Sequence, residues 1–89
     1  MSQLKKENMD KLEEVNELME EVELEIQKAL SMVSLNVSPI ESFLDVFTLL
    51  NKVKNICDSI DDIAIKNVAQ GKLKVSILDL ETKLSQALV

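Results

Sequence analysis

The apolar residues in the first third of the chain recur at alternating intervals of three and four residues. The stripe comprises Leu12, Val15, Met19, Val22, Ile26, Ala29 and Val33. This spacing places the side chains on one face of an α-helix and is typical of helices that pack along one another in coiled coils. No glycine or proline interrupts residues 2–35, and most other positions are Glu, Asn or Lys. We therefore predict a first helix at about residues 3–33.

A second helix is predicted to follow a chain reversal near Pro39. Ser38 and Glu41 flank a proline that suits the first turn of a helix, which is the pattern of a capping box. The same spacing then continues through Val46, Leu49, Val53, Ile56, Ile60 and Ile63. This unbroken register favours one helix at about residues 39–69. The alternative is a new segment that starts at Asp58 and Ser59.

A third, shorter helix is predicted at about residues 72–88. Gly71, the single glycine, suits the left-handed end of the preceding helix. The apolar spacing resumes with Leu73, Ile77, Leu80, Leu84 and Ala87. Residues 72–77 alternate as a strand would, but no partner strand is predicted elsewhere, so a helix is preferred. Without repeats or a long linker, residues 1–89 are expected to form a single helical domain.

The expected fold is all-α: an antiparallel three-helix bundle with two long helices and a shorter C-terminal helix, completed by oligomerisation. The long helices would each span roughly 45 Å and the third about 25 Å, so the third would leave the tip of the hairpin uncovered. The residues expected to form an oligomer interface there are Leu24, Leu30, Ile40, Phe43, Leu44, Phe47 and Leu50. The competing hypothesis is a monomer in which the second helix breaks near Asp58 and the chain forms four short helices.

Charge changes this picture at the first helix. The chain has 16 acidic and 10 basic residues, for a formal net charge of -6. Glutamates at Glu13, Glu17, Glu20 and Glu21 form a candidate acidic face, and the pair Glu13 and Glu17 repel each other at i,i+4 spacing. A cationic partner would relieve this repulsion, although a solvated surface is the simpler interpretation.

Composition excludes many kinds of site. The sequence contains no histidine, arginine, tryptophan or tyrosine. The chain therefore has no imidazole to act as a base or metal ligand, and no guanidinium group to bind phosphates or bases through paired hydrogen bonds. We therefore expect no enzyme, no cofactor and no metal site. Direct nucleic-acid binding is disfavoured by the acidic charge, no apolar run is long enough to span a membrane, and the expected location is the cytoplasm.

Two smaller features have candidate chemistry. Cys57 lies beside Ile56 on the apolar side of the second predicted helix and is expected to be a small core residue. Asp58, Asp61 and Asp62 are spaced so that their carboxylates share one helix face, but the glycine turn and closing glutamate of a calcium loop are absent. Capping and solvation are the preferred interpretation of these aspartates.

These observations favour a non-enzymatic, helical protein–protein interaction module that self-associates or serves as a small subunit of a larger assembly. The alternative is an acidic inhibitor protein, of viral or mobile-element type, that occupies a basic site on a partner through the glutamate-rich first helix. The first hypothesis depends on apolar burial and the second on charge, so salt dependence separates them.

Overall fold

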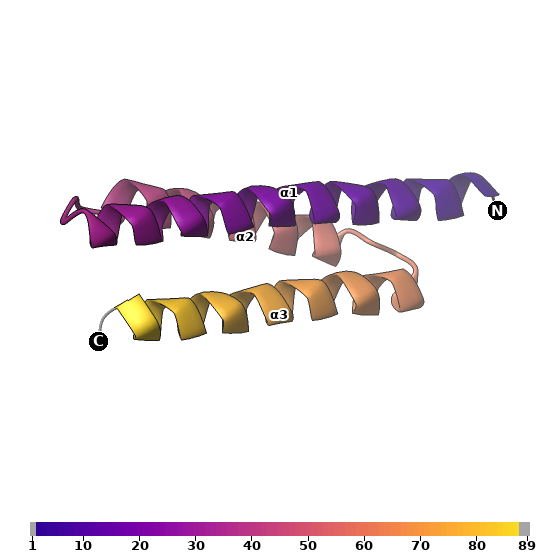
Figure 1. The fold of residues 1–89 in the computed structure, drawn as a ribbon. Helices are drawn as coiled ribbons and strands as arrows, with labels where there is room; N and C mark the ends of the chain where they lie inside the picture. The colour runs from indigo at the N-terminus through magenta and orange to yellow at the C-terminus, as the bar shows by residue number, and fades with distance from the viewer. Residues whose placement is uncertain (1, 88–89) are drawn as a thin grey trace.

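The computed structural model describes the backbone of residues 2–87 and the side chains of residues 6–86. Three helices account for this part of the chain: α1 at Ser2–Ser34, α2 at Ile40–Asp58 and α3 at Ile63–Ala87. They pack against one another, and the described residues include no strand. The chain reverses direction at residues 35–39 and again at residues 59–62, which gives an elongated body of 53 × 18 × 14 Å (Figure 1). The predicted all-α bundle is thus confirmed at this level, and residues 72–77 are helical.

α1 follows its predicted bounds to within one residue at each end. Val15, Val22, Ile26 and Ala29 of the predicted stripe are fully buried. The helix ends at a turn in which Asn36 takes the left-handed conformation, with φ of 60°. The N–H of Val37 donates to the carbonyl of Met32 at 2.8 Å, as in a Schellman motif that satisfies the last carbonyls of a helix.

α2 starts one residue after the predicted position and lacks the predicted cap. Pro39 occupies the N-cap position, and no side chain forms a capping hydrogen bond there. The carbonyl of Pro39 instead accepts from the N–H of Phe43 at 3.0 Å. The proposed capping box of Ser38 and Glu41 is therefore wrong, because the helix begins one residue later, at Ile40.

The single second helix predicted at residues 39–69 is also wrong, because α2 ends at Asp58. Local hydrogen bonds explain the break. The hydroxyl of Ser59 donates to the carbonyl of Ile56 at 2.7 Å, and a side-chain oxygen of Asp62 accepts from the N–H of Ile65 at 3.1 Å. Ser59 thus closes one helix while Asp62 caps the next, which satisfies backbone groups that a helix end leaves unpaired.

α1 holds this connection from the other side. The ammonium group of Lys11 donates to the carbonyl of Ser59 at 2.8 Å. The side-chain oxygen of Asn8 accepts from the N–H of Asp61 at 3.2 Å, and Asn8 is itself only 2% exposed. The break near Asp58 was the alternative interpretation of the sequence, but the four short helices attached to it do not form, because α3 continues without interruption.

α3 is longer than predicted, because Gly71 does not end a helix. It lies inside α3 and does not take a positive φ. α3 therefore begins nine residues before the predicted start at Lys72, whereas the predicted last residue, 88, lies outside the described part of the chain. With 25 residues against 19 in α2, the third helix is not the short one. The prediction that α3 is too short to cover the hairpin of α1 and α2, on which the exposed tip depended, is therefore wrong.

The interior consists of two clusters along the bundle. One contains Val15, Val53, Cys57, Ile60 and Ala69, and the other contains Val22, Ile26, Val46 and Leu80. Leu30 and Leu84 pack against the second cluster, so α3 accompanies the hairpin of α1 and α2 almost to its turn (Figure 1). Each cluster includes residues from all three helices, which makes the helices one packing unit.

Candidate interaction surfaces

The predicted interface residues divide between exposed and half-buried positions. We call the full set the hairpin surface: Leu24, Leu30, Ile40, Phe43, Leu44, Phe47 and Leu50. Ile40, Leu44 and Phe47 are 63%, 58% and 56% exposed and follow one another along α2. Leu30, Phe43 and Leu50 are half-buried, and Leu30 and Leu50 pack against the core. The structure thus places an exposed apolar face on α2, while part of the predicted set serves the core.

Ile40, Leu44 and Phe47 are exposed because of the side of α2 on which they lie, and not because α3 is too short to cover them. Ser42, Val46 and Val53 face the core from α2, whereas Ile40, Leu44 and Phe47 lie on a different side of the same helix. A helix with apolar residues over so wide an arc cannot bury all of them against two neighbours. Leu35 and Val37, in the turn that precedes α2, are also exposed apolar residues.

A groove between α2 and α3 adjoins the hairpin surface. It has a volume of about 440 Å³, and its lining residues are Phe47, Leu50, Asn51, Lys54, Leu73, Ile77, Leu80, Glu81 and Leu84. Six of these nine side chains are aliphatic or aromatic. Lys54 and Glu81 supply one charge of each sign. An apolar groove with a few polar groups is the usual form of a site that receives an apolar segment of another molecule.

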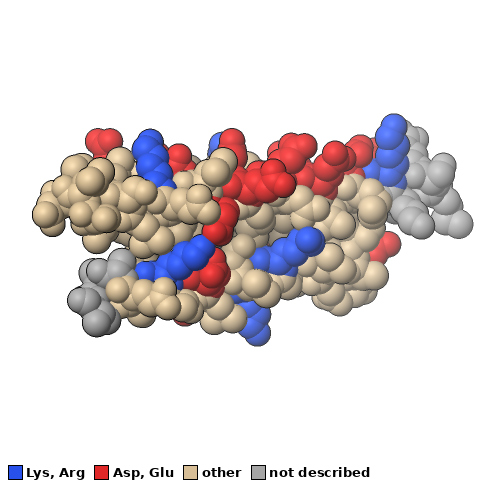
Figure 2. Space-filling view, viewed as in Figure 1, with Lys and Arg blue, Asp and Glu red and all other residues tan. Residues whose placement is uncertain are grey.

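The acidic face of α1 lies where the sequence predicted it. Glu13, Glu17, Glu20 and Glu21 are all exposed, and Figure 2 shows acidic side chains gathered along this helix. Glu23 differs from them, because its carboxylate accepts from the ammonium group of Lys83 at 2.6 Å.

Lys83 joins α1 to α3 through that contact. It also lies 3.0 Å from a carboxylate oxygen of Asp79. The hydrogen bonds from Lys83 to Glu23 and to Asp79 raise the pKa of its ammonium group above the ordinary value. Glu23 is therefore part of the packing between helices and is unsuited to a partner-binding role.

Glu25 occupies a second groove, between α1 and α2. This groove of about 390 Å³ is lined by Glu21, Leu24, Glu25, Asp45, Thr48 and Leu49. Within the described residues, Oε2 of Glu25 is buried without a hydrogen-bond partner. An unpaired buried carboxylate oxygen is costly, and a cationic group entering the groove would offset that cost. Glu25 is not part of the acidic face predicted from the sequence, and only the fold brings it into the same groove as Asp45.

The remaining candidates are structural. Cys57 is fully buried, and desolvation, followed by the nearby charge of Asp58, raises the pKa of its thiol. Asp62 caps α3, and the described residues contain no group of three or more acidic or cysteine side chains arranged to hold a metal ion. None of the described helices is sufficiently long and apolar to cross a membrane.

Sequence reasoning missed a further apolar face, on α3. We call it the outer stripe: Ala64, Val68, Gly71, Val75, Leu78 and Thr82. All six residues are exposed. Their spacing of 4, 3, 4, 3 and 4 residues was visible in the sequence. It was overlooked because Gly71 was interpreted as a helix end.

Comparison with known proteins identifies no relative. The sequence matches no protein-family model, and no curated protein and no solved structure shows a significant match.

Proposed function

We propose that this protein is a non-enzymatic interaction module: an antiparallel helical bundle, of coiled-coil type, that binds a helical partner or a second copy through the hairpin surface. The observation that supports this most directly is the exposed row of Ile40, Leu44 and Phe47 beside the groove between α2 and α3. Their spacing of four and three residues matches the pattern with which one helix meets another.

Burial of this row provides the driving force. Transfer of apolar area from water contributes roughly 25 cal/mol per Å², and aromatic side chains such as Phe47 contribute disproportionately at interfaces. Large contiguous apolar patches on a soluble chain usually mark an interaction site. A partner helix with apolar residues at i, i+3, i+4 and i+7 would fill the groove and cover Phe47.

Composition supports a role without catalysis. With no histidine or arginine and a lone buried cysteine of raised thiol pKa, the chain offers few groups suited to acid–base or nucleophilic chemistry. A single unpaired cysteine also fits a reducing compartment, so we expect the protein to act in the cytoplasm.

The variant Phe47→Asp tests the proposal. Because Phe47 is more than half exposed, the variant should keep its helical circular-dichroism spectrum. It should lose binding of a helical partner, or of a second copy, through the hairpin surface, as measured by sedimentation velocity. Asn55→Asp is a matched control, since it introduces the same charge at another exposed position of α2. The proposal would be overturned if folded Phe47→Asp had the same mass distribution as the wild type and the control. It would also have to bind any partner of the wild-type chain with undiminished affinity.

A second function, that of an acidic inhibitor bound to a basic site, is favoured by the buried unpaired oxygen of Glu25 beside Glu21 and Asp45. The probe is a lysine homopolymer of defined length, titrated by calorimetry at low and physiological salt. Binding should weaken steeply with salt and be lost in the double variant Glu17→Lys and Glu21→Lys. The control, Glu41→Lys with Glu81→Lys, makes the same change of charge elsewhere. If both double variants lost binding of the lysine homopolymer equally, the binding would depend only on net charge, and this function would be rejected.

A further inference from the structure

The outer stripe of α3 gives this helix a second apolar face. Its inward side places Ala69 and Leu80 in the core and packs Leu73 and Leu84 against it. On the outer stripe, Val68, Val75 and Leu78 are 50%, 66% and 53% exposed, and within the described residues no other helix covers them. A heptad spacing held over residues 64–82 is the arrangement by which a helix packs along another helix.

Gly71 lies at the middle of this stripe and is unexplained by its own chain. A glycine inside a helix costs about 1 kcal/mol relative to alanine. It takes no positive φ, and a Cβ added to it would meet nothing within 4 Å. Neither a turn nor a close contact within the bundle therefore requires glycine here. Close approach of a second backbone from outside would use it, because a side chain at this position keeps two helices apart.

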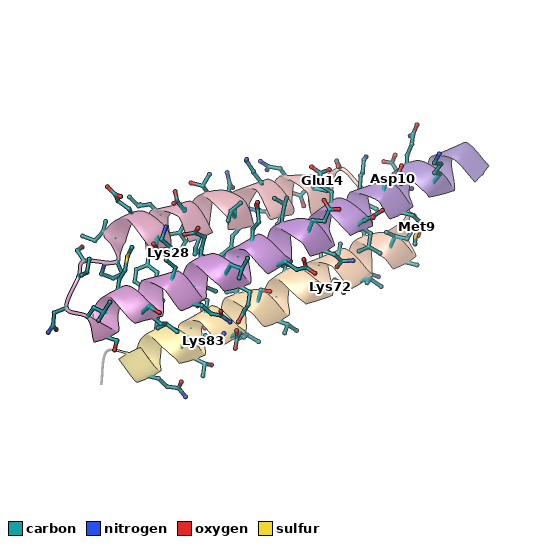
Figure 3. All side chains as sticks on the ribbon, turned by 45° about the horizontal axis from the view of Figure 1, so that its top comes forward. Met9, Asp10, Glu14, Lys28, Lys72 and Lys83 are labelled. Carbon is teal, nitrogen blue, oxygen red and sulfur yellow. The ribbon has the colours of Figure 1, made fainter. Side chains whose placement is uncertain are left out.

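A groove between α1 and α3 runs along one edge of the stripe. It has a volume of about 500 Å³ and is lined by Asn16, Met19, Gly71, Lys72, Val75 and Ser76. A helix packed on Gly71 and Val75 would therefore also approach α1. Figure 3 shows Lys72 on α3, between the ribbons of α3 and α1 in that view.

Charge indicates which helix fits. α1 has nine acidic and four basic residues, whereas α3 has two acidic and four basic residues. A helix that packs on the outer stripe near α1 is therefore favoured if it has an excess of basic residues. α3 of a second copy has such an excess. We propose that the outer stripe is a homodimer interface in which α3 packs in parallel against α3 of a second copy.

The same charges select the parallel direction. A twofold axis parallel to α3 places the two α1 helices on opposite sides of the α3 pair, so that each lies on the same side of the pair as Lys74 of the other copy. Lys74 and Glu20 are both exposed, and in this arrangement Lys74 of one copy would approach Glu20 of the other. An antiparallel pair would instead place both acidic α1 helices on the same side, where they repel each other. The hairpin surfaces of the two copies remain free, so the dimer presents two of them to partners.

Sedimentation equilibrium of Val75→Asp tests the interface. The substitution buries a carboxylate at the proposed contact but lies at an exposed position of the single chain, so the helical spectrum should be retained. We expect the dimer dissociation constant to rise at least about tenfold, and the control Asn55→Asp to leave it unchanged. An unaltered dissociation constant would overturn the proposal. Loss of association in Phe47→Asp but not in Val75→Asp would place self-association at the hairpin surface and reject this one. Loss in Val75→Asp but not in Phe47→Asp is the result expected here, because the dimer leaves both hairpin surfaces free.

Two further variants test the direction of the pair. Lys74→Glu and Glu20→Lys should each weaken the dimer by about threefold to tenfold, and an equimolar mixture should restore it, since both contacts are then complementary. In a Cys57→Ala background, Val75→Cys should form an intermolecular disulfide on mild oxidation, because identical core positions face each other in a parallel pair. Absence of both the restored mixture and the disulfide would overturn the parallel arrangement.

Discussion

The side-chain oxygen of Asn8 accepts a hydrogen bond from the backbone N–H of Asp61 at 3.2 Å, across 53 residues of sequence. Asn8 is buried and occupies a core-facing position of α1 where an aliphatic residue would continue the stripe. The contact attaches the connection between α2 and α3 to α1. It therefore helps to set where α2 ends and which faces α3 presents to solvent.

Replacing Asn8 with alanine should destabilise the fold. The N–H of Asp61 would lose its acceptor in a partly buried setting, and we expect the free energy of unfolding to fall by about 1–3 kcal/mol. Urea denaturation followed by circular dichroism measures this. Asn16→Ala, at an exposed position of the same helix, should change stability by no more than about 0.5 kcal/mol. Equal effects at the two sites would contradict a specific role for Asn8.

Asp62→Ala should weaken the start of α3. The side chain caps the helix by accepting from the N–H of Ile65 at 3.1 Å, and loss of an N-cap costs about 0.5–2 kcal/mol. Thermal unfolding monitored at 222 nm provides the measurement. Asp61→Ala is the comparison, because the described hydrogen bonds of Asp61 use its backbone and not its carboxylate. A loss of stability in Asp61→Ala as large as in Asp62→Ala would refute the assigned cap.

Lys83→Met should remove the ion pair that joins α3 to α1. The group is partly exposed, so the cost at pH 7 should not exceed about 1 kcal/mol. Since hydrogen bonds to Glu23 and Asp79 raise the pKa of Lys83 above 10.5, the contribution is complete below that pH and is lost as the pH rises through the folded-state pKa. The difference between wild type and variant, measured by urea unfolding from pH 7 to 12, should therefore shrink at the alkaline end. A constant difference would be inconsistent with the ion pair.

Cys57 should react slowly while the protein is folded. Burial removes access to the thiol, and desolvation raises its pKa above the ordinary value of 9.0, which lowers the thiolate fraction. Alkylation by iodoacetamide at pH 8, followed by mass spectrometry, should be at least about tenfold slower in buffer than in denaturing urea. The thiol ionises at a lower pH in the unfolded chain than in the folded one. The free energy of unfolding should therefore fall as the pH rises above 9.0. Equal rates in the two solvents would show that the thiol is accessible.

The sequence was sufficient for α1, because its stripe has one clear face and no interruption. It was insufficient at the break between α2 and α3. Ile60 and Ile63 continue the apolar spacing, yet Ile60 lies in the connection and is buried, whereas Ile63 is 75% exposed. The pattern hid the break because a loop residue fills the core position that a continuous helix would have filled. The capping bonds of Ser59 and Asp62 decided the outcome locally.

The candidate surfaces were predicted in part. Exposure of Ile40, Leu44 and Phe47 agrees with the predicted set, but the reason given for it, a short third helix, was wrong. Gly71 produced the largest error, since glycine at the end of a helix is more common than glycine within one. Its assignment as a terminator divided the outer stripe and hid the second face of α3. The acidic setting of Glu25 required the fold, because Asp45 reaches it only through the packing of α2 on α1.

In our proposal, the outer stripe that the single chain leaves exposed is covered by a second copy of the chain. Sedimentation velocity of the wild-type chain over a range of concentrations tests it most directly. We predict a weight-average mass that rises above the 10.0 kDa of one chain as concentration increases, and that falls in Val75→Asp. A single species of 10.0 kDa at every concentration would contradict it.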